Sequence, residues 1–102
     1  MVDLEQTAML LIVHAGNARS LAYDGFELAS AGDFAGAALK LREATGEIGL
    51  AHAEQTALIQ AEAAGRGAPL TLLMVHAQDH LMTAMTEVNL IERLIRILEL
   101  KR

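Results

Sequence analysis

The chain has 102 residues, of which 53% are hydrophobic but only 3% aromatic, and its 19 Ala and 17 Leu contrast with a single Pro. This composition favours close-packed helices over sheets, whose interiors prefer β-branched and aromatic side chains, and the length suits one domain. The absence of Cys excludes disulfide scaffolds, thiol catalysis and Cys-ligated zinc, and the net charge of −5 has the wrong sign for nucleic-acid binding.

Two clusters of turn residues divide the expected single domain, residues 1–102, into three predicted helices. In the first cluster, residues 31–33 (AGD), Gly can end one helix and Asp can cap the next. In the second, residues 65–69 (GRGAP), Pro suits the first turn of a new helix. Because short connections make long neighbouring helices antiparallel, we predict an all-α, up-down-up three-helix bundle. The predicted helices span residues 4–30, 33–64 and 69–101.

Each predicted helix carries an apolar seam with the alternating three- and four-residue spacing of helices packed lengthwise. The first seam consists mainly of small residues: Leu4, Ala8, Leu11, Ala15, Ala18, Ala22, Gly25 and Ala29. The second begins apolar and becomes polar: Phe34, Ala37, Leu41, Ala44, Ile48, Ala51, Gln55, Leu58 and Glu62. The third is apolar throughout: Leu70, Met74, Ala77, Leu81, Ala84, Val88, Ile91, Ile95 and Leu98. The three seams predict the core.

The third predicted helix is apolar well beyond its seam. The additional apolar residues are Leu72, Leu73, Val75, Met82, Met85, Leu90, Leu94, Ile97 and Leu100. A helix that is apolar on most of its circumference is normally buried on more than one side, which three helices alone cannot provide. We therefore predict a homo-oligomer with closed cyclic symmetry, in which copies of this helix face one another. The alternative is a partner protein that covers the second face.

The densest group of reactive side chains, residues 76–80 (HAQDH), lies within this apolar helix. Residues three and four apart share a helix face, so His76 can neighbour both Asp79 and His80. The group could act as a nucleophile or base, bind a metal, or be a solvated interruption. Zinc binding by the two histidines alone is a weak hypothesis, because their spacing lacks the glutamate and third ligand of a zincin.

Two further polar groups favour a structural interpretation, in which imidazole and amide groups satisfy one another across helices. They consist of His52, Glu54, Gln55 and Glu62 in the second predicted helix, and of His14, Asn17, Arg19 and Ser20 in the first.

The sequence also bears on location. No uncharged apolar run reaches the roughly 18 to 20 residues that a membrane span needs, so we expect no membrane insertion. The first five residues lack the basic start of a signal peptide. We therefore expect a soluble, cytoplasmic protein.

Three stretches of the chain carry a resemblance to a known family. They are residues 72–83 (LLMVHAQDHLMT), residues 14–20 (HAGNARS) and residues 51–65 (AHAEQTALIQAEAAG). In order and spacing they resemble the lactose/cellobiose (N,N'-diacetylchitobiose) class of enzyme IIA from the bacterial sugar phosphotransferase system (PTS). The resemblance implies a phosphocarrier, in which His76 accepts a phosphoryl group from the phosphocarrier HPr as a tele-phosphohistidine. A cysteine of the cognate IIB protein or domain then receives the group, for uptake of a disaccharide such as lactose, cellobiose or chitobiose.

The resemblance further implies a homotrimer of three-helix subunits. Asp79 is then expected near the threefold axis, where three copies hold one divalent cation, typically Mg²⁺. Three converging carboxylates repel one another unless protons or a hard cation relieve the repulsion. Gln78 and His80 are candidates for hydrogen bonds to phosphoryl oxygens, either within the subunit or across its interface.

Two other functions fit parts of the pattern. One is a non-catalytic helical trimer whose polar group only binds metal. The other is a histidine-phosphotransfer module of two-component signalling, which also mounts a histidine on a helical bundle. The second is disfavoured because such bundles usually have four helices and lack the sequence HAQDHLM.

Overall fold

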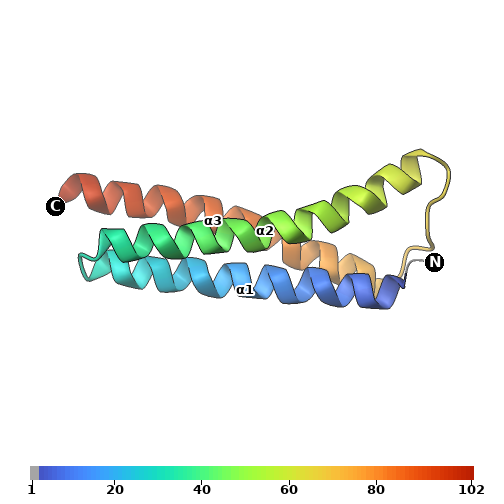
Figure 1. The fold of residues 1–102 in the computed structure, drawn as a ribbon, viewed down its shortest axis with the longest axis horizontal. Helices are drawn as coiled ribbons and strands as arrows, with labels where there is room; N and C mark the ends of the chain where they lie inside the picture. The colour runs from blue at the N-terminus through green and yellow to red at the C-terminus, as the bar shows by residue number, and fades with distance from the viewer. Residues whose placement is uncertain (1–2) are drawn as a thin grey trace.

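The computed structural model describes residues 3–102, which form three α-helices and no strands. The helices are α1 (Leu4–Ser30), α2 (Phe34–Ala63) and α3 (Leu72–Lys101). They run up, down and up along a bundle of 52 × 20 × 18 Å (Figure 1). The predicted all-helical, three-helix fold is therefore confirmed. Met1 and Val2, which the expected domain includes, lie outside the described residues.

The turn between α1 and α2 forms as the sequence predicts. Gly32 has a positive φ of 91°, a conformation that glycine adopts without steric cost and that commonly ends a helix. The carboxylate of Asp33 then accepts a hydrogen bond from the backbone N–H of Gly36 at 2.8 Å and caps α2. The two residues together reverse the chain within a short connection.

The predicted start of the third helix at residue 69 is wrong, because α3 begins at Leu72. Thr71 has an extended backbone, and its hydroxyl accepts a hydrogen bond from the N–H of Met74 at 3.1 Å. A threonine that caps the helix in this way outcompetes Pro69 as the starting signal. As a result Leu70, which was expected in the core seam, lies in the connection and is 83% exposed.

The core confirms most of the predicted seams, but α2 contributes less than expected. The buried hydrophobic residues of α1 and α3 are Ala8, Leu11, Ala15, Ala18, Ala22 and Ala29, and Met74, Ala77, Leu81, Ala84, Val88, Ile91 and Ile95. In α2 the buried seam residues are Ala37, Ala44 and Ala51, while Phe34, Leu41 and Ile48 are only partly buried. The bundle is thus centred on α1.

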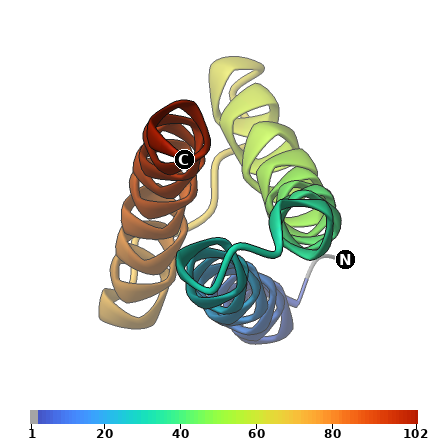
Figure 2. The ribbon, with the colours of Figure 1, turned by 90° about the vertical axis from the view of Figure 1, so that its left-hand side faces the viewer.

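The helix α1 packs closely against both neighbours, whereas α2 and α3 contact each other much less. Small residues allow this approach: a Cβ placed on Gly25 would lie only 3.3 Å from the carbonyl oxygen of Ala37. Toward its C-terminal end α2 leans away from the start of α3 (Figures 1 and 2). The first turns of α3, which carry the histidines, therefore pack mainly on α1.

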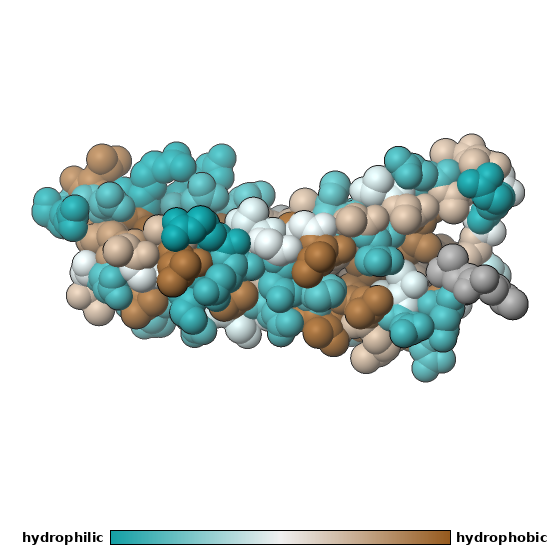
Figure 3. Space-filling model, viewed as in Figure 1, coloured by the Kyte–Doolittle hydropathy of each residue, from teal (hydrophilic) through white to brown (hydrophobic). Residues whose placement is uncertain are grey.

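The additional apolar residues of α3 remain at the surface of the single subunit. Figure 3 shows hydrophobic residues reaching the surface of one side of the bundle, interleaved with hydrophilic ones. On α3, the large hydrophobic residues that are at least 45% exposed are Leu72, Val75, Met82, Leu90, Leu94, Ile97 and Leu100. An apolar surface of this extent on one helix is typical of an interaction face.

We predict that Leu81→Ala lowers the free energy of unfolding by about 2–5 kcal/mol, because it leaves a cavity in the core. Leu81 is fully buried in the cluster that joins α1, α2 and α3. Leu50→Ala is the matched control, since Leu50 is 56% exposed, and its effect should stay within about 0.5 kcal/mol. Urea denaturation followed by circular dichroism measures both values, and equal losses would contradict the assigned core.

We also predict that Asp33→Ala destabilises the protein by about 0.5–2 kcal/mol, because the first turn of α2 loses its cap. Asp33→Asn should retain nearly all of the stability, since an asparagine oxygen can accept the same hydrogen bond from Gly36. The same denaturation experiment compares the two variants. Equal destabilisation by both would show that the charge, not the cap, matters.

Candidate functional site

The two histidines of α3 form a direct pair one helical turn apart. The Nε2 atoms of His76 and His80 lie 3.0 Å apart. The two rings are nearly perpendicular, with an interplanar angle of 89° and centroids 4.5 Å apart. His76 is exposed and His80 is partly buried. The two histidines, which were expected to share one face of the helix, are thus in direct contact.

The hydrogen bond between the rings requires that one Nε2 atom carries a proton and the other presents a lone pair. When His80 donates, the Nε2 atom of His76 is unprotonated, and its remaining proton sits on Nδ1. An exposed imidazole nitrogen is a nucleophile once its electron pair is released from this hydrogen bond, and the N–H that releases it can then bind an anion that arrives there. The pair is therefore suited to accept an electrophilic group on His76.

Asp79 does not join the histidine pair through a hydrogen bond in the described part of the chain. Its side chain is exposed, and its backbone carbonyl accepts a hydrogen bond from the Thr83 hydroxyl at 2.8 Å. Within residues 3–102 no cluster of three or more His, Cys, Asp or Glu residues could hold a metal ion. A single subunit therefore contributes one carboxylate, which fits a hard cation only when further copies supply the other ligands.

Gln78 lies on a different side of α3 from His76. Two residues turn an α-helix by about 200°, which directs Gln78 toward α2. There its side-chain oxygen accepts a hydrogen bond from Gln55 at 2.5 Å, and its amide contacts the sulfur of Met74 at 3.8 Å. Gln78 was expected to bind phosphoryl oxygens either within the subunit or across its interface, and this geometry directs it away from His76 of its own subunit.

A polar network that the sequence did not predict continues the histidine face of α3. We define this face as His76, His80, Thr83 and Glu87. Arg19 of α1 forms an ion pair with Glu87 through Nε, and its Nη2 donates to the Thr83 hydroxyl at 2.8 Å.

Tyr23, also on α1, completes the network, since its hydroxyl donates to Glu87 at 3.1 Å. The hydrogen bond from Arg19 holds the pKa of Glu87 below its ordinary value. The hydrogen bond to Glu87, together with the negative charge of that carboxylate, raises the pKa of Tyr23. In the sequence, the spacing of four residues places Arg19 and Tyr23 on one face of a helix. It does not indicate which other helix this face contacts.

In the two polar groups for which a structural role was predicted, His14 and Gln55 form contacts across helices. His14 of α1 pairs with Glu47 of α2 through Nδ1 at 2.5 Å, and Gln55 links α2 to α3. His52 is exposed on α2. None of these side chains belongs to the histidine face.

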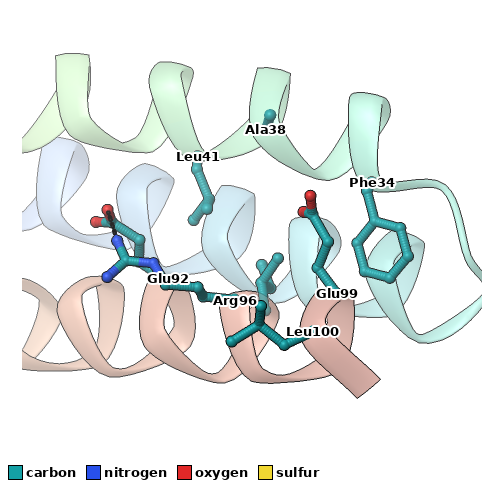
Figure 4. A pocket seen from close by; sticks show the side chains of 8 residues that line it. Phe34, Ala38, Leu41, Glu92, Arg96, Glu99 and Leu100 are labelled. Atoms are coloured by element: carbon teal, nitrogen blue, oxygen red, sulfur yellow. Dashed lines mark hydrogen bonds and ion pairs between the residues drawn. The ribbon is translucent and has the colours of Figure 1, made fainter. Parts of the chain in front are cut away.

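A pocket of about 320 Å³ lies between α2 and α3 near the C-terminal end of α3. Figure 4 shows Phe34 and Leu41 reaching in from α2, opposite Glu92, Arg96 and Glu99. Glu92 lies 16 residues after His76, about 24 Å along a helix. The pocket is therefore separate from the histidine pair.

Comparison with known proteins places this chain in one family along almost its whole length. A family model described as "PTS system, Lactose/Cellobiose specific IIA subunit" matches residues 6–99. The lichenan-specific phosphotransferase enzyme IIA component of Bacillus subtilis (strain 168) is 45% identical over 97 residues, which cover 95% of this chain and 88% of that protein.

Among the described residues, no helix combines the length and hydropathy that a membrane crossing requires.

Solved structures agree with the sequence comparison. The crystal structure of the PTS cellobiose-specific enzyme IIA from Bacillus anthracis matches with a TM-score of 0.91 and 39% identity, covering 97% of this chain and 91% of that one. A chain from the solution structures of the IIA(Chitobiose)–HPr complex of Escherichia coli matches with a TM-score of 0.85 and 41% identity, covering 100% of both chains. The chain therefore belongs to the lactose/cellobiose-specific IIA subunit family of the PTS, whose members are phosphotransferase components of sugar transport.

Proposed function

We propose that this chain is a phosphocarrier that accepts a phosphoryl group from HPr on His76 and passes it to a cysteine of a IIB protein or domain. The observation that carries the proposal is the exposed His76 Nε2 atom, 3.0 Å from the Nε2 atom of His80, in a chain of the IIA family. A relative with 41% identity was solved in complex with HPr. The carrier works in the cytoplasm, as one domain of residues 1–102.

The transfer is a displacement at phosphorus. The lone pair on Nε2 of His76 forms a new N–P bond while the bond from phosphorus to the donor atom of HPr breaks, and its electron pair returns to that atom. Transfer to IIB is the corresponding displacement by a cysteine sulfur, and the electron pair returns to Nε2. Such reactions depend mainly on positioning and charge stabilisation, which a rigid helix provides.

His80 supports the reaction in two stages. In the tautomer in which its Nε2 carries the proton, His80 donates to Nε2 of His76 before transfer, and it releases that electron pair as the phosphoryl group approaches. Once the phosphoryl group occupies that nitrogen, the same N–H is free to donate to a phosphoryl oxygen. A charge-assisted hydrogen bond of this kind is stronger than one between neutral groups.

We further propose that three copies assemble around a threefold axis along the outer stripe of α3. This stripe lies opposite the buried seam, has the three- and four-residue spacing of a coiled coil, and consists of exposed residues. Its central members are Val75, Asp79, Met82, Thr86 and Asn89. Assembly would cover part of the apolar surface that the single subunit exposes.

The same arrangement gives Gln78 a role. Residues that flank a coiled-coil seam contact the opposite flank of the next helix, and Gln78 and His76 lie on opposite flanks of the outer stripe. Gln78 of one subunit would then approach the His76 flank of the neighbouring copy. This supports a hydrogen bond from Gln78 to the phosphoryl group across the interface.

Asp79 would hold one divalent cation per trimer, Mg²⁺ in our proposal. An exposed carboxylate in the outer stripe suits oxygen coordination by a hard cation. When bound, the cation supplies positive charge that offsets the repulsion among three carboxylates. Asp79 itself takes no part in proton transfer.

HPr docking is expected to use the apolar residues beside His76. Leu72, which is not a central member of the outer stripe, is 85% exposed in the single subunit. The net charge of −5 leaves little scope for a strongly basic docking surface on this chain. The sugar, such as lactose, cellobiose or chitobiose, is bound by another component of the system.

We predict that incubation with phosphoenolpyruvate, enzyme I and HPr adds one acid-labile phosphoryl group to the wild-type protein, detected by intact mass. His76→Gln should abolish the label because it removes the nucleophile. His52→Gln is the matched control and should label like the wild type, since His52 is exposed on another helix.

An unlabelled wild-type protein would refute the carrier function and favour a helical trimer that only binds metal. A His76→Gln variant that still labels would move the acceptor to another residue.

We predict that Asp79→Leu removes the bound cation while the trimer persists, because an apolar axis replaces a costly cluster of carboxylates. Elemental analysis measures the metal, and light scattering coupled to size exclusion measures the mass of the assembly. Unchanged metal content would contradict the assigned ligand. A monomeric wild-type protein would contradict the trimer.

A further inference from the structure

The histidine face carries a positively charged group that the proposed transfer does not yet use. Arg19 donates from Nη2 to the Thr83 hydroxyl at 2.8 Å. That hydroxyl lies 3.2 Å from the backbone carbonyl of His80, whose ring contacts His76. Three contacts therefore connect the guanidinium to the phosphoryl acceptor. Among the described residues, no other Lys or Arg forms a hydrogen bond with this face.

Within one subunit, Arg19 is the only Lys or Arg among the described residues that forms a hydrogen bond with the histidine face, and the cation proposed at Asp79 would lie on the outer stripe instead. The histidine face includes the ionisable groups His80 and Glu87, and Arg19 and Tyr23 of α1 contact Glu87. Asp79 lies beside the face on α3. A phosphoryl group adds about −1.5 to −2 charges at pH 7 to a chain whose net charge is already −5. A nearby positive charge would therefore stabilise the phosphorylated state, and Arg19 can supply that charge.

In the present structure the partner of Arg19 carries less negative charge than a phosphoryl group would. Its Nε pairs with the single negative charge of Glu87, which also accepts a hydrogen bond from Tyr23. The side chains of Arg19 and Glu87 are 29% and 32% exposed, so Arg19 can change its conformation without opening the core. Thr83 lies three residues beyond His80 and seven beyond His76, about 4.5 and 10.5 Å along the helix. The Nε2 atom of His76 lies 3.0 Å from that of His80, so a phosphoryl group on it begins beside the His80 ring. The guanidinium must move from Thr83 toward the His80 ring to reach its oxygens.

We propose that Arg19 is the charge partner of phosphorylated His76, and that Glu87 and Tyr23 hold it in place until the phosphoryl group arrives. The guanidinium then turns from Glu87 toward the phosphoryl oxygens, which offer more negative charge and a geometry that arginine binds well. This inference rests on the proposed phosphoryl transfer to His76. It assigns to α1 a direct part in a reaction that the sequence places entirely on α3.

The test uses two variants that break the same ion pair but leave opposite charges behind. In Arg19→Gln the phosphoryl group loses its partner, whereas in Glu87→Gln it no longer competes with a carboxylate for Arg19. We expect Arg19→Gln to shift the equilibrium of phosphoryl exchange with HPr about fivefold toward phospho-HPr, and Glu87→Gln to shift it toward phosphorylated His76. Intact mass after mixing with a fixed amount of phospho-HPr measures the phosphorylated fraction.

A purely structural role of the ion pair predicts a different result. Both variants would then weaken the contact between α1 and α3 and change the equilibrium in the same direction. Arg19→Lys should recover part of the wild-type value because it keeps the charge. The chemical shift of the phosphoryl phosphorus should move in Arg19→Gln as its surroundings change.

Controls for long-range charge are available on α2. Arg42→Gln and Glu43→Gln change the net charge as the two test variants do, at exposed positions away from the histidine face, and both should keep the wild-type equilibrium. If the wild-type protein is phosphorylated and Arg19→Gln reaches the same equilibrium, the proposed role of Arg19 is wrong, but the proposed transfer to His76 stands. Wild-type protein that never labels would instead overturn the proposed transfer. Should Arg19→Gln fail to fold, Glu87→Gln and Arg19→Lys still decide the question.

Discussion

The close packing of α1 against both other helices is the constraint on which the rest of the structure depends. Its buried stripe consists almost entirely of Ala and Gly, with Leu11 as the main exception. Small side chains let two helices approach the same axis, so each obtains its burial from α1. The consequence is that α2 and α3 need little contact with each other, and α3 keeps most of its circumference available.

The whole circumference of α3 divides into three stripes with separate tasks. One stripe is buried against α1 and α2 and holds the helix in place. The outer stripe, which contains Asp79, faces away from the bundle and is the one we assign to the trimer axis. Between them lies the histidine face, where His76 and His80 meet and where α1 contributes Arg19. A rigid helix fixed on one side can thus present a nucleophile on another.

Charge is distributed on this helix in a way that suits a transient anion. The polar groups of the histidine face are satisfied by one another in the resting state: His76 by His80, and Glu87 by Arg19 and Tyr23. In the transfer that we propose, the donors His80 and Arg19 exchange these contacts for contacts with phosphoryl oxygens without unfolding any element. A carrier needs this property because it must bind the group and release it within one cycle.

The sequence by itself predicted the three helices, most of the seams of α1 and α3, and Asp79 and His80 as neighbours of His76, because all of these follow from spacing along one helix. Only the folded chain shows that His80, and not Asp79, contacts the His76 ring. The sequence misplaced the start of α3, since capping by Thr71 and the proline signal compete locally and only the folded chain decides between them. The tertiary structure alone decided the partners across helices. Gln78 meets Gln55 of α2, and Arg19 meets Glu87 of α3, because such pairs depend on the rotation and offset of packed helices, which no periodicity within a single helix encodes.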